Sequence, residues 1–173
     1  MTEPSAPVLY TLTDRRGPGR LSTMARPRGH GHLADDMAAL RRAGADIVVC
    51  ALPDAERTEL GLTDEPRHAE AAGLRFVALP IPDFTVPSVP SVLPVLRELA
   101  EALRTGTHVV AHCRCAIGRS SLIAVSLMIL EGTAPEAAWT AMERARGARV
   151  PDTEEQRTWT LEFYRLLSPG GVP

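Results

Sequence analysis

The segment His112–Ser121, HCRCAIGRSS, contains a cysteine and an arginine whose spacing is suited to binding and attacking a phosphate. An apolar run, Thr107–His112, predicts a strand before Cys113, and a helix is expected to begin just after Arg119. A tight loop that opens a helix turns backbone N–H groups inward, and the helix dipole adds positive potential. Arg119 can grip a phosphate there through two N–H groups. The same field favours the Cys113 thiolate, because helix N-termini and nearby cations lower a cysteine pKa from about 8.5 to roughly 3.5–7.5.

Displacement at phosphorus also needs an acid for the leaving oxygen, and Asp83 is the candidate. It lies in the Pro-rich loop 80–94, directly after the predicted strand Leu74–Leu79. A parallel sheet would bring that loop to the same edge as Cys113. As a carboxylate, Asp83 could then activate water for hydrolysis of a phosphorylated cysteine. Ser120 could hydrogen-bond the sulfur and make it a better leaving group.

The elements that must position these residues alternate between strand and helix patterns. The predicted strands are Val8–Thr13, Asp46–Leu52, Leu74–Leu79 and Thr107–His112. The predicted helices are His32–Ala43, one or two within 54–72, Val92–Leu103, Ser120–Leu130, Pro135–Arg146 and Thr153–Leu167. Residues 14–20 are expected to form a turn-rich connection. This alternation predicts an α/β three-layer sandwich, with a central, mostly parallel sheet of about four or five strands and helices on both faces.

Three motifs resemble those of the cysteine-dependent protein tyrosine and dual-specificity phosphatases. HCRCAIGRSS is similar to the HCx5R(S/T) signature of that family. LPIPDFTVP (79–87) is similar to the general-acid loop of the small atypical dual-specificity phosphatases, and VPDTEEQ (150–156) resembles the segment where the family carries glutamine. The resemblance extends over residues 20–167. It implies the phosphatase α/β fold, a phospho-cysteine intermediate and neither a metal nor an organic cofactor.

The resemblance assigns roles by position. It makes Cys113 the nucleophile, Arg119 the phosphate clamp, Asp83 the general acid and Ser120 the partner of the thiolate. His112 is an accessory residue that could orient the loop through its imidazole. The phosphate-binding loop comprises Cys113, Arg114, Cys115, Ala116, Ile117, Gly118 and Arg119.

The chain departs from the family pattern at two places. The family usually has glycine three residues after the cysteine, where this chain has Ala116. If that position needs a positive φ, alanine costs about 1–2 kcal/mol, and turnover is expected to fall. Asp152 occupies the first glutamine position and only Gln156 matches the second, so both are accessory candidates for placing water.

Cys50 is a candidate redox partner for Cys113. It lies near the end of the predicted strand Asp46–Leu52. If that strand neighbours Thr107–His112, a strand spacing of about 4.8 Å brings the two cysteines near disulfide range. Some family members resemble this arrangement, with a second cysteine at the end of that strand. The alternative is that Cys50 is an inert core cysteine.

Composition excludes several other classes of protein. The 173 residues and 45% apolar content predict one catalytic domain over 1–173, with loose tails at 1–7 and 168–173. A net charge of −2 argues against nucleic acid as a partner. All 19 basic residues are arginine, which excludes Schiff-base chemistry and a lysine-bearing phosphate loop. The longest uncharged apolar run, Leu122–Leu130, is too short to span a membrane. Three cysteines without a secretory signal predict a cytoplasmic protein, expected to be a monomer.

These observations together favour a phosphatase that acts on phosphotyrosine in proteins. Phosphoserine and phosphothreonine are also expected substrates, since no insertion deepens the pocket. One alternative is a rhodanese-type sulfurtransferase, which would not need Asp83. A second is a low-turnover phosphate-binding module, suggested by Ala116. No metal site is expected, because the histidines and cysteines lack the usual ligand spacings.

Overall fold

The central sheet has five strands in the order β1-β2-β5-β3-β4, as seen in the computed structural model, which describes residues 6–170. The strands are β1 (Tyr10–Thr11), β2 (Arg20–Met24), β3 (Ile47–Cys50), β4 (Arg75–Ala78) and β5 (His108–His112). Among the strands within residues 6–170, only β1 pairs antiparallel, and the other pairs are parallel. The predicted α/β class and sheet are confirmed. Parts of both predicted tails, residues 1–5 and 171–173, lie outside the described residues.

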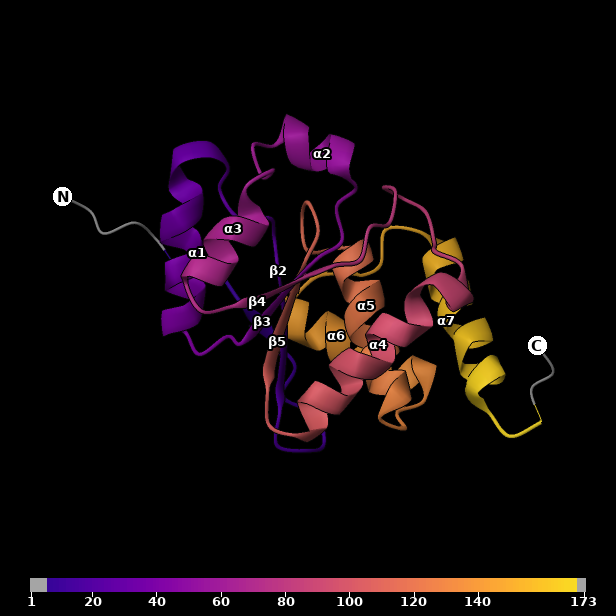
Figure 1. The fold of residues 1–173 in the computed structure, drawn as a ribbon. Helices are drawn as coiled ribbons and strands as arrows, with labels where there is room; N and C mark the ends of the chain where they lie inside the picture. The colour runs from indigo at the N-terminus through magenta and orange to yellow at the C-terminus, as the bar shows by residue number, and fades with distance from the viewer. Residues whose placement is uncertain (1–5, 171–173) are drawn as a thin grey trace.

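Helices cover both faces of the sheet (Figure 1). One face carries α1 (Leu33–Arg42) and α3 (Glu65–Ala71). The other carries α4 (Val89–Arg104), α5 (Arg119–Leu130), α6 (Pro135–Arg146) and α7 (Glu154–Leu167). The short α2 (Asp54–Glu59) and the 3₁₀ turn η1 (His30–His32) lie in the connections. The three predicted layers are therefore present.

The parallel strands are buried from both sides, which explains their continuous apolar sequences. On β3, Val48 and Cys50 pack toward α1 and α3, whereas Val49 packs toward α4 and α5. Helix α5 runs through the core, and all its residues except Leu130 are buried. Because α5 is fixed on all sides, the loop that enters it from β5 has a rigid base.

The structure differs from the sequence prediction at three elements, the first of which is the predicted strand Val8–Thr13, found only at Tyr10–Thr11. The strand β2 was not predicted, because its start fell in the turn-rich segment and its centre is polar. Ser22 is buried there because its hydroxyl bonds the His108 ring nitrogen at 2.8 Å. Helix α4 begins at Val89, before the predicted start, and Pro94 lies inside it.

Candidate active site

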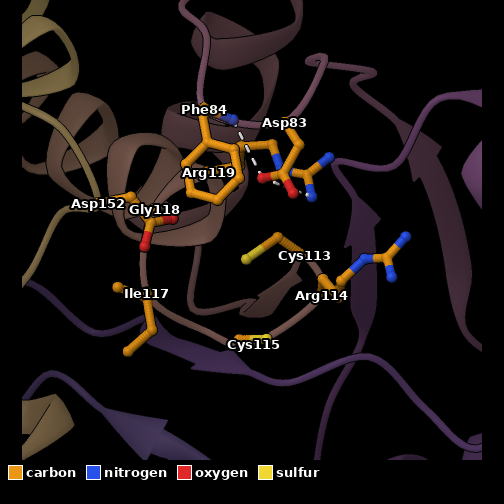
Figure 2. A pocket seen from close by; sticks show the side chains of 9 residues that line it. All are labelled: Asp83, Phe84, Cys113, Arg114, Cys115, Ile117, Gly118, Arg119 and Asp152. Atoms are coloured by element: carbon orange, nitrogen blue, oxygen red, sulfur yellow. Dashed lines mark hydrogen bonds and ion pairs between the residues drawn. The ribbon is translucent and has the colours of Figure 1, made fainter.

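The phosphate-binding loop lies at the carboxyl end of β5, where it joins α5 (Figure 2). A cavity opens over this loop and is lined from three chain segments. The lining residues are Asp83, Phe84, Cys113, Arg114, Cys115, Ile117, Gly118, Arg119 and Asp152. The fold therefore brings the predicted cysteine, arginine and acid loop to one edge of the sheet.

Cys113 sits at the base of the cavity with 3% of its surface exposed. Its sulfur lies 3.2 Å from the Ser120 hydroxyl. Burial opposes ionisation of the thiol, but this hydrogen bond and those from the backbone N–H groups of Ser120, Cys115 and Ile117 outweigh it. The net effect is a lowered pKa of Cys113. The loop can therefore hold a thiolate, and the same N–H groups can bind the oxygens of a phosphate.

Arg119 is buried and held from two sides by carboxylates. Its Nη1 and Nη2 donate to the two carboxylate oxygens of Glu56 at 2.7 and 3.1 Å. Its Nη2 also lies 3.1 Å from Oδ1 of Asp83, and its Nη1 donates to the Ile81 carbonyl at 3.0 Å. These contacts hold the guanidinium of Arg119 in one orientation at the wall of the cavity.

Glu56 is a site residue that the sequence analysis missed. Burial raises the pKa of its carboxyl, but Arg119 and Arg114 outweigh burial, so the pKa of Glu56 is lowered. The only signal in the sequence was its place just after the strand β3, at the sheet edge where functional loops gather.

Asp83 faces the cavity from the loop that follows β4 (Figure 2). Its side chain is 36% exposed, and its Oδ1 also accepts a hydrogen bond from the Phe84 N–H at 3.0 Å. Phe84 has a φ of 59°, and 59% of its surface is exposed, so its ring forms an apolar wall beside the acid. The position suits Asp83 for proton transfer to an oxygen bound above Cys113.

Asp152 lines the opposite side of the cavity, at the start of the segment that leads to α7. Burial and the charge of Asp83 raise the pKa of its carboxyl, although Arg119 opposes them. The carboxylate packs so closely on Gly118 that a Cβ there would lie 2.2 Å from Oδ2. Gly118 therefore has to be glycine for Asp152 to take this position.

Gln156 is buried and does not line the cavity. Its Oε1 accepts the backbone N–H groups of Asp152 and Thr153 at 3.1 and 3.2 Å, which closes the capping box of α7. Its Nε2 donates to the Thr85 carbonyl at 3.4 Å. In this structure Gln156 thus ties the acid loop to the segment that carries Asp152.

His112 is fully buried behind the loop. Its Nε2 bonds Oε1 of the buried Glu65 at 2.7 Å, and its Nδ1 lies 3.3 Å from the Cys113 carbonyl. Burial lowers the pKa of His112, but the Glu65 charge and the nearby Cys50 thiol outweigh it and hold that pKa well above the usual value. A charged imidazole can donate from Nδ1 to the Cys113 carbonyl, as expected for a residue that orients the loop.

Cys50 lies beside this pair, opposite His112 in the register of β3 and β5. Ligand-type atoms of Cys50, Glu65 and His112 lie within 4.8 Å of one another. Because Glu65 and His112 bond each other directly, we interpret these two residues as a buried ion pair with the Cys50 thiol beside it. Cys50 packs toward α1 and α3, whereas Cys113 packs toward α4 and α5, so their side chains leave opposite faces of the sheet.

Ala116 has a φ of 60° and is fully buried. The condition raised for this loop position, a positive φ at an alanine, is therefore met. The side chain of Cys115 is exposed, and that of Arg114 lies 3.4 Å from both Glu56 and Glu59.

Within residues 6–170, no helix has the length and apolar character needed to cross a membrane.

Comparison with known proteins places the chain among phosphatases. Residues 22–133 match the family model described as "Tc-R-P: Polymorphic toxin system, DSP-PTPase phosphatase". Cyclin-dependent kinase inhibitor 3 of Mus musculus is 32% identical over 90 residues, and that of Rattus norvegicus is 30% identical over 91 residues. Each of these matches covers 51% of this chain and 43% of the relative, so the chain aligns with less than half of these curated relatives.

Two solved structures resemble the fold over most of its length. Tk-PTP in its active form is 29% identical, with a TM-score of 0.71, over 84% of this chain and 92% of that one. Kinase associated phosphatase, solved with serine in place of its catalytic-site cysteine, has a TM-score of 0.81 over 93% of this chain and 96% of that one. At 20% identity, the second likeness shows the fold. These matches confirm the family resemblance that the motifs suggested.

Proposed function

The chain belongs to the DSP-PTPase phosphatase family of polymorphic toxin systems, and we propose that it hydrolyses phosphomonoesters in proteins through a phospho-cysteine intermediate. The observation that carries the proposal is the lowered pKa of Cys113 in a cradle of N–H groups, with Arg119 and Asp83 in the same cavity. A sulfurtransferase would have no use for a carboxyl group in the position of Asp83.

In the first step, the Cys113 thiolate attacks phosphorus while Arg119 and the loop N–H groups hold the phosphate oxygens. The S–P bond forms and the P–O bond to the substrate breaks. Asp83 gives its proton to the departing oxygen. Substrate binding displaces Asp83 from its ion pair with Arg119, because the phosphate takes that place on the guanidinium.

In the second step, Asp83 as a carboxylate takes a proton from water. The water oxygen bonds to phosphorus and the S–P bond breaks, which releases phosphate. The hydrogen bond from Ser120 stabilises the thiolate that leaves. Asp152 and Gln156 are accessory residues in this proposal: Asp152 lines the cavity where the attacking water would bind, and Gln156 holds the backbone that carries Asp152.

Phosphotyrosine is the favoured substrate, because the exposed Phe84 ring offers an apolar wall to a phenyl ring. Phosphoserine and phosphothreonine are also substrates in this proposal. The enzyme acts as a monomer and in the cytoplasm, where a reducing environment keeps the free thiols Cys50, Cys113 and Cys115 reduced.

The test compares wild type, Cys113→Ser and Arg119→Lys on para-nitrophenyl phosphate and a phosphotyrosine peptide. Wild type should hydrolyse both. Cys113→Ser should be inactive yet still bind tungstate, since the loop N–H groups and Arg119 that hold an oxyanion remain, and this binding also shows that the variant is folded. Arg119→Lys should lose most activity, because a point charge cannot make the bidentate grip. Thiosulfate-to-cyanide sulfur transfer by wild type, without phosphate release, would replace the proposal with the sulfurtransferase alternative.

A further inference from the structure

Arg146, the last residue of α6, contacts the phosphate-binding loop from outside the cavity. Its Nε donates to the Ala116 carbonyl at 3.0 Å. Its guanidinium also lies over the Tyr10 ring of β1, with Cζ 4.2 Å from the ring centroid. Stacking on an aromatic face fixes the guanidinium plane and leaves its N–H edge free to donate. Two elements far from the cavity thus hold one carbonyl of the loop.

The Ala116 carbonyl shares a peptide plane with the Ile117 N–H. In a trans peptide these two groups point in opposite directions. The Ile117 N–H is one of the backbone groups that hydrogen-bond the Cys113 sulfur. A donor that holds the Ala116 oxygen outward therefore keeps the Ile117 N–H directed inward, along the loop that curves around Cys113 in Figure 2.

Ala116 makes this support necessary. Its φ of 60° lies in the left-handed region, which a side chain with a Cβ disfavours and glycine accepts. If Ala116 left that region, the peptide planes on both sides would rotate and the Ile117 N–H would lose its direction. A buried alanine with this backbone persists only where the surroundings hold it in place.

We infer that Arg146, stacked on Tyr10, is a positioning residue that orients the Ala116–Ile117 peptide toward Cys113 and a bound phosphate. The inference rests on the proposed function, because it concerns the same cradle. It goes further than the proposed function because it assigns the orientation of the Ile117 N–H to Arg146, a residue outside the signature segment His112–Ser121. The requirement for Arg146 follows from alanine at position 116.

The experiment compares Arg146→Met in two backgrounds, the native chain and Ala116→Gly. Methionine keeps an apolar stem and removes the donors. Arg144→Met is the matched control, because Arg144 lies on the same helix, is exposed and bonds Asp14 away from the loop. Three quantities are measured: kcat/KM for para-nitrophenyl phosphate, the Kd of orthovanadate, and the Cys113 pKa from the pH dependence of alkylation by iodoacetamide.

In the native background, Arg146→Met should lower kcat/KM and weaken vanadate binding by about tenfold, and should raise the Cys113 pKa. In the Ala116→Gly background the same change should cost roughly threefold or less, because glycine holds the left-handed backbone unaided. Arg144→Met should match wild type. Equal losses in the two backgrounds would assign Arg146 a general structural role and overturn the inference. The inference would also be overturned if Arg146→Met had the same vanadate affinity and the same Cys113 pKa as the control Arg144→Met.

Tyr10→Leu gives a second route if Arg146→Met does not fold. It removes the stacking face and should shift the same three quantities in the same direction by a smaller factor; no shift would contradict the inference. Vanadate binding and thiol pKa do not require turnover. A wild type that binds vanadate but hydrolyses no phosphate ester would contradict the proposed function while the role of Arg146 is still measured.

Discussion

Arg119 and Cys113 owe their chemistry to partners that are distant in sequence. Glu56, on the short helix α2, and Asp83, in the loop after β4, orient the guanidinium, whereas the N–H groups of the phosphate-binding loop and Ser120 stabilise the thiolate. A CX5R spacing alone therefore predicts the two reacting side chains, and the fold supplies the groups that fix their charge and direction.

At the residue scale, Asp83→Asn should lower kcat by ~10²–10⁴-fold, which is the rate enhancement that a positioned acid–base group usually contributes. The loss should be greatest for alkyl phosphates, whose leaving oxygen most needs a proton. The check is kcat across a series of leaving groups. An unchanged kcat across the series would assign the acid to another carboxyl, such as Asp152 in the same cavity.

The pH profile gives a second check on these residues. The acid limb of kcat/KM should rise at a pH below the value of about 8.5 expected of an ordinary cysteine, because the Cys113 pKa is lowered. An acid limb with a midpoint at that ordinary value would contradict the lowered thiol pKa.

At the scale of elements, α3 contacts the site through the Glu65–His112 pair behind β5. Breaking a buried ion pair by removing one charge costs several kcal/mol. We expect Glu65→Gln to lower the free energy of unfolding by about 3 kcal/mol. Glu59→Gln, at an exposed carboxylate on α2, is the control and should change it little.

The cost of Glu65→Gln should also depend on pH. The pKa of His112 is raised in the folded protein. The contribution of the charged imidazole to the free energy of unfolding is therefore fully present below the unfolded pKa of about 6.5, and it is lost as the pH rises through the folded pKa. The stability difference between wild type and Glu65→Gln, from urea denaturation, should therefore be larger at about pH 6 than at about pH 9. Equal differences at both values would mean that His112 is not charged in the folded state.

The pairing of β3 with β5 also bears on the proposed redox role of Cys50. Cys50 faces His112 in the register, one residue before Cys113. Peroxide would oxidise the Cys113 thiolate to a sulfenic acid, and the Cys50 thiol would then displace water to form a disulfide. Because the two side chains leave opposite faces of the sheet, the backbone at Cys113 must rotate for this bond to close.

We expect peroxide to inactivate wild type reversibly, with a Cys50–Cys113 peptide found by non-reducing mapping and activity restored by dithiothreitol. Cys50→Ser should lose the recovery, because the sulfenic acid then oxidises further. A Cys50→Ser enzyme that is inactivated and rescued like wild type would leave Cys50 as a core cysteine.

At the scale of the whole molecule, the layers and the sheet edge could be predicted because alternating apolar runs and glycine stops are local signals. The signature could be placed because β5, the loop and α5 are contiguous in the chain. The strand β2 could not, since its polar Ser22 is satisfied only by His108, far away in sequence. Glu56, Glu65 and Arg146 were missed for the same reason: isolated charged residues on helices acquire their partners only in the folded protein.

The phospho-cysteine intermediate is the central claim, and it can be observed directly. Wild type turning over para-nitrophenyl phosphate should be quenched rapidly in acid and digested, and the peptide that contains Cys113 analysed by mass spectrometry. We predict that this peptide carries one phosphoryl group, and that Asp83→Asn accumulates more of it because water is no longer activated. A fully active enzyme with no phosphoryl group on Cys113, or with the group on another residue, would contradict the account.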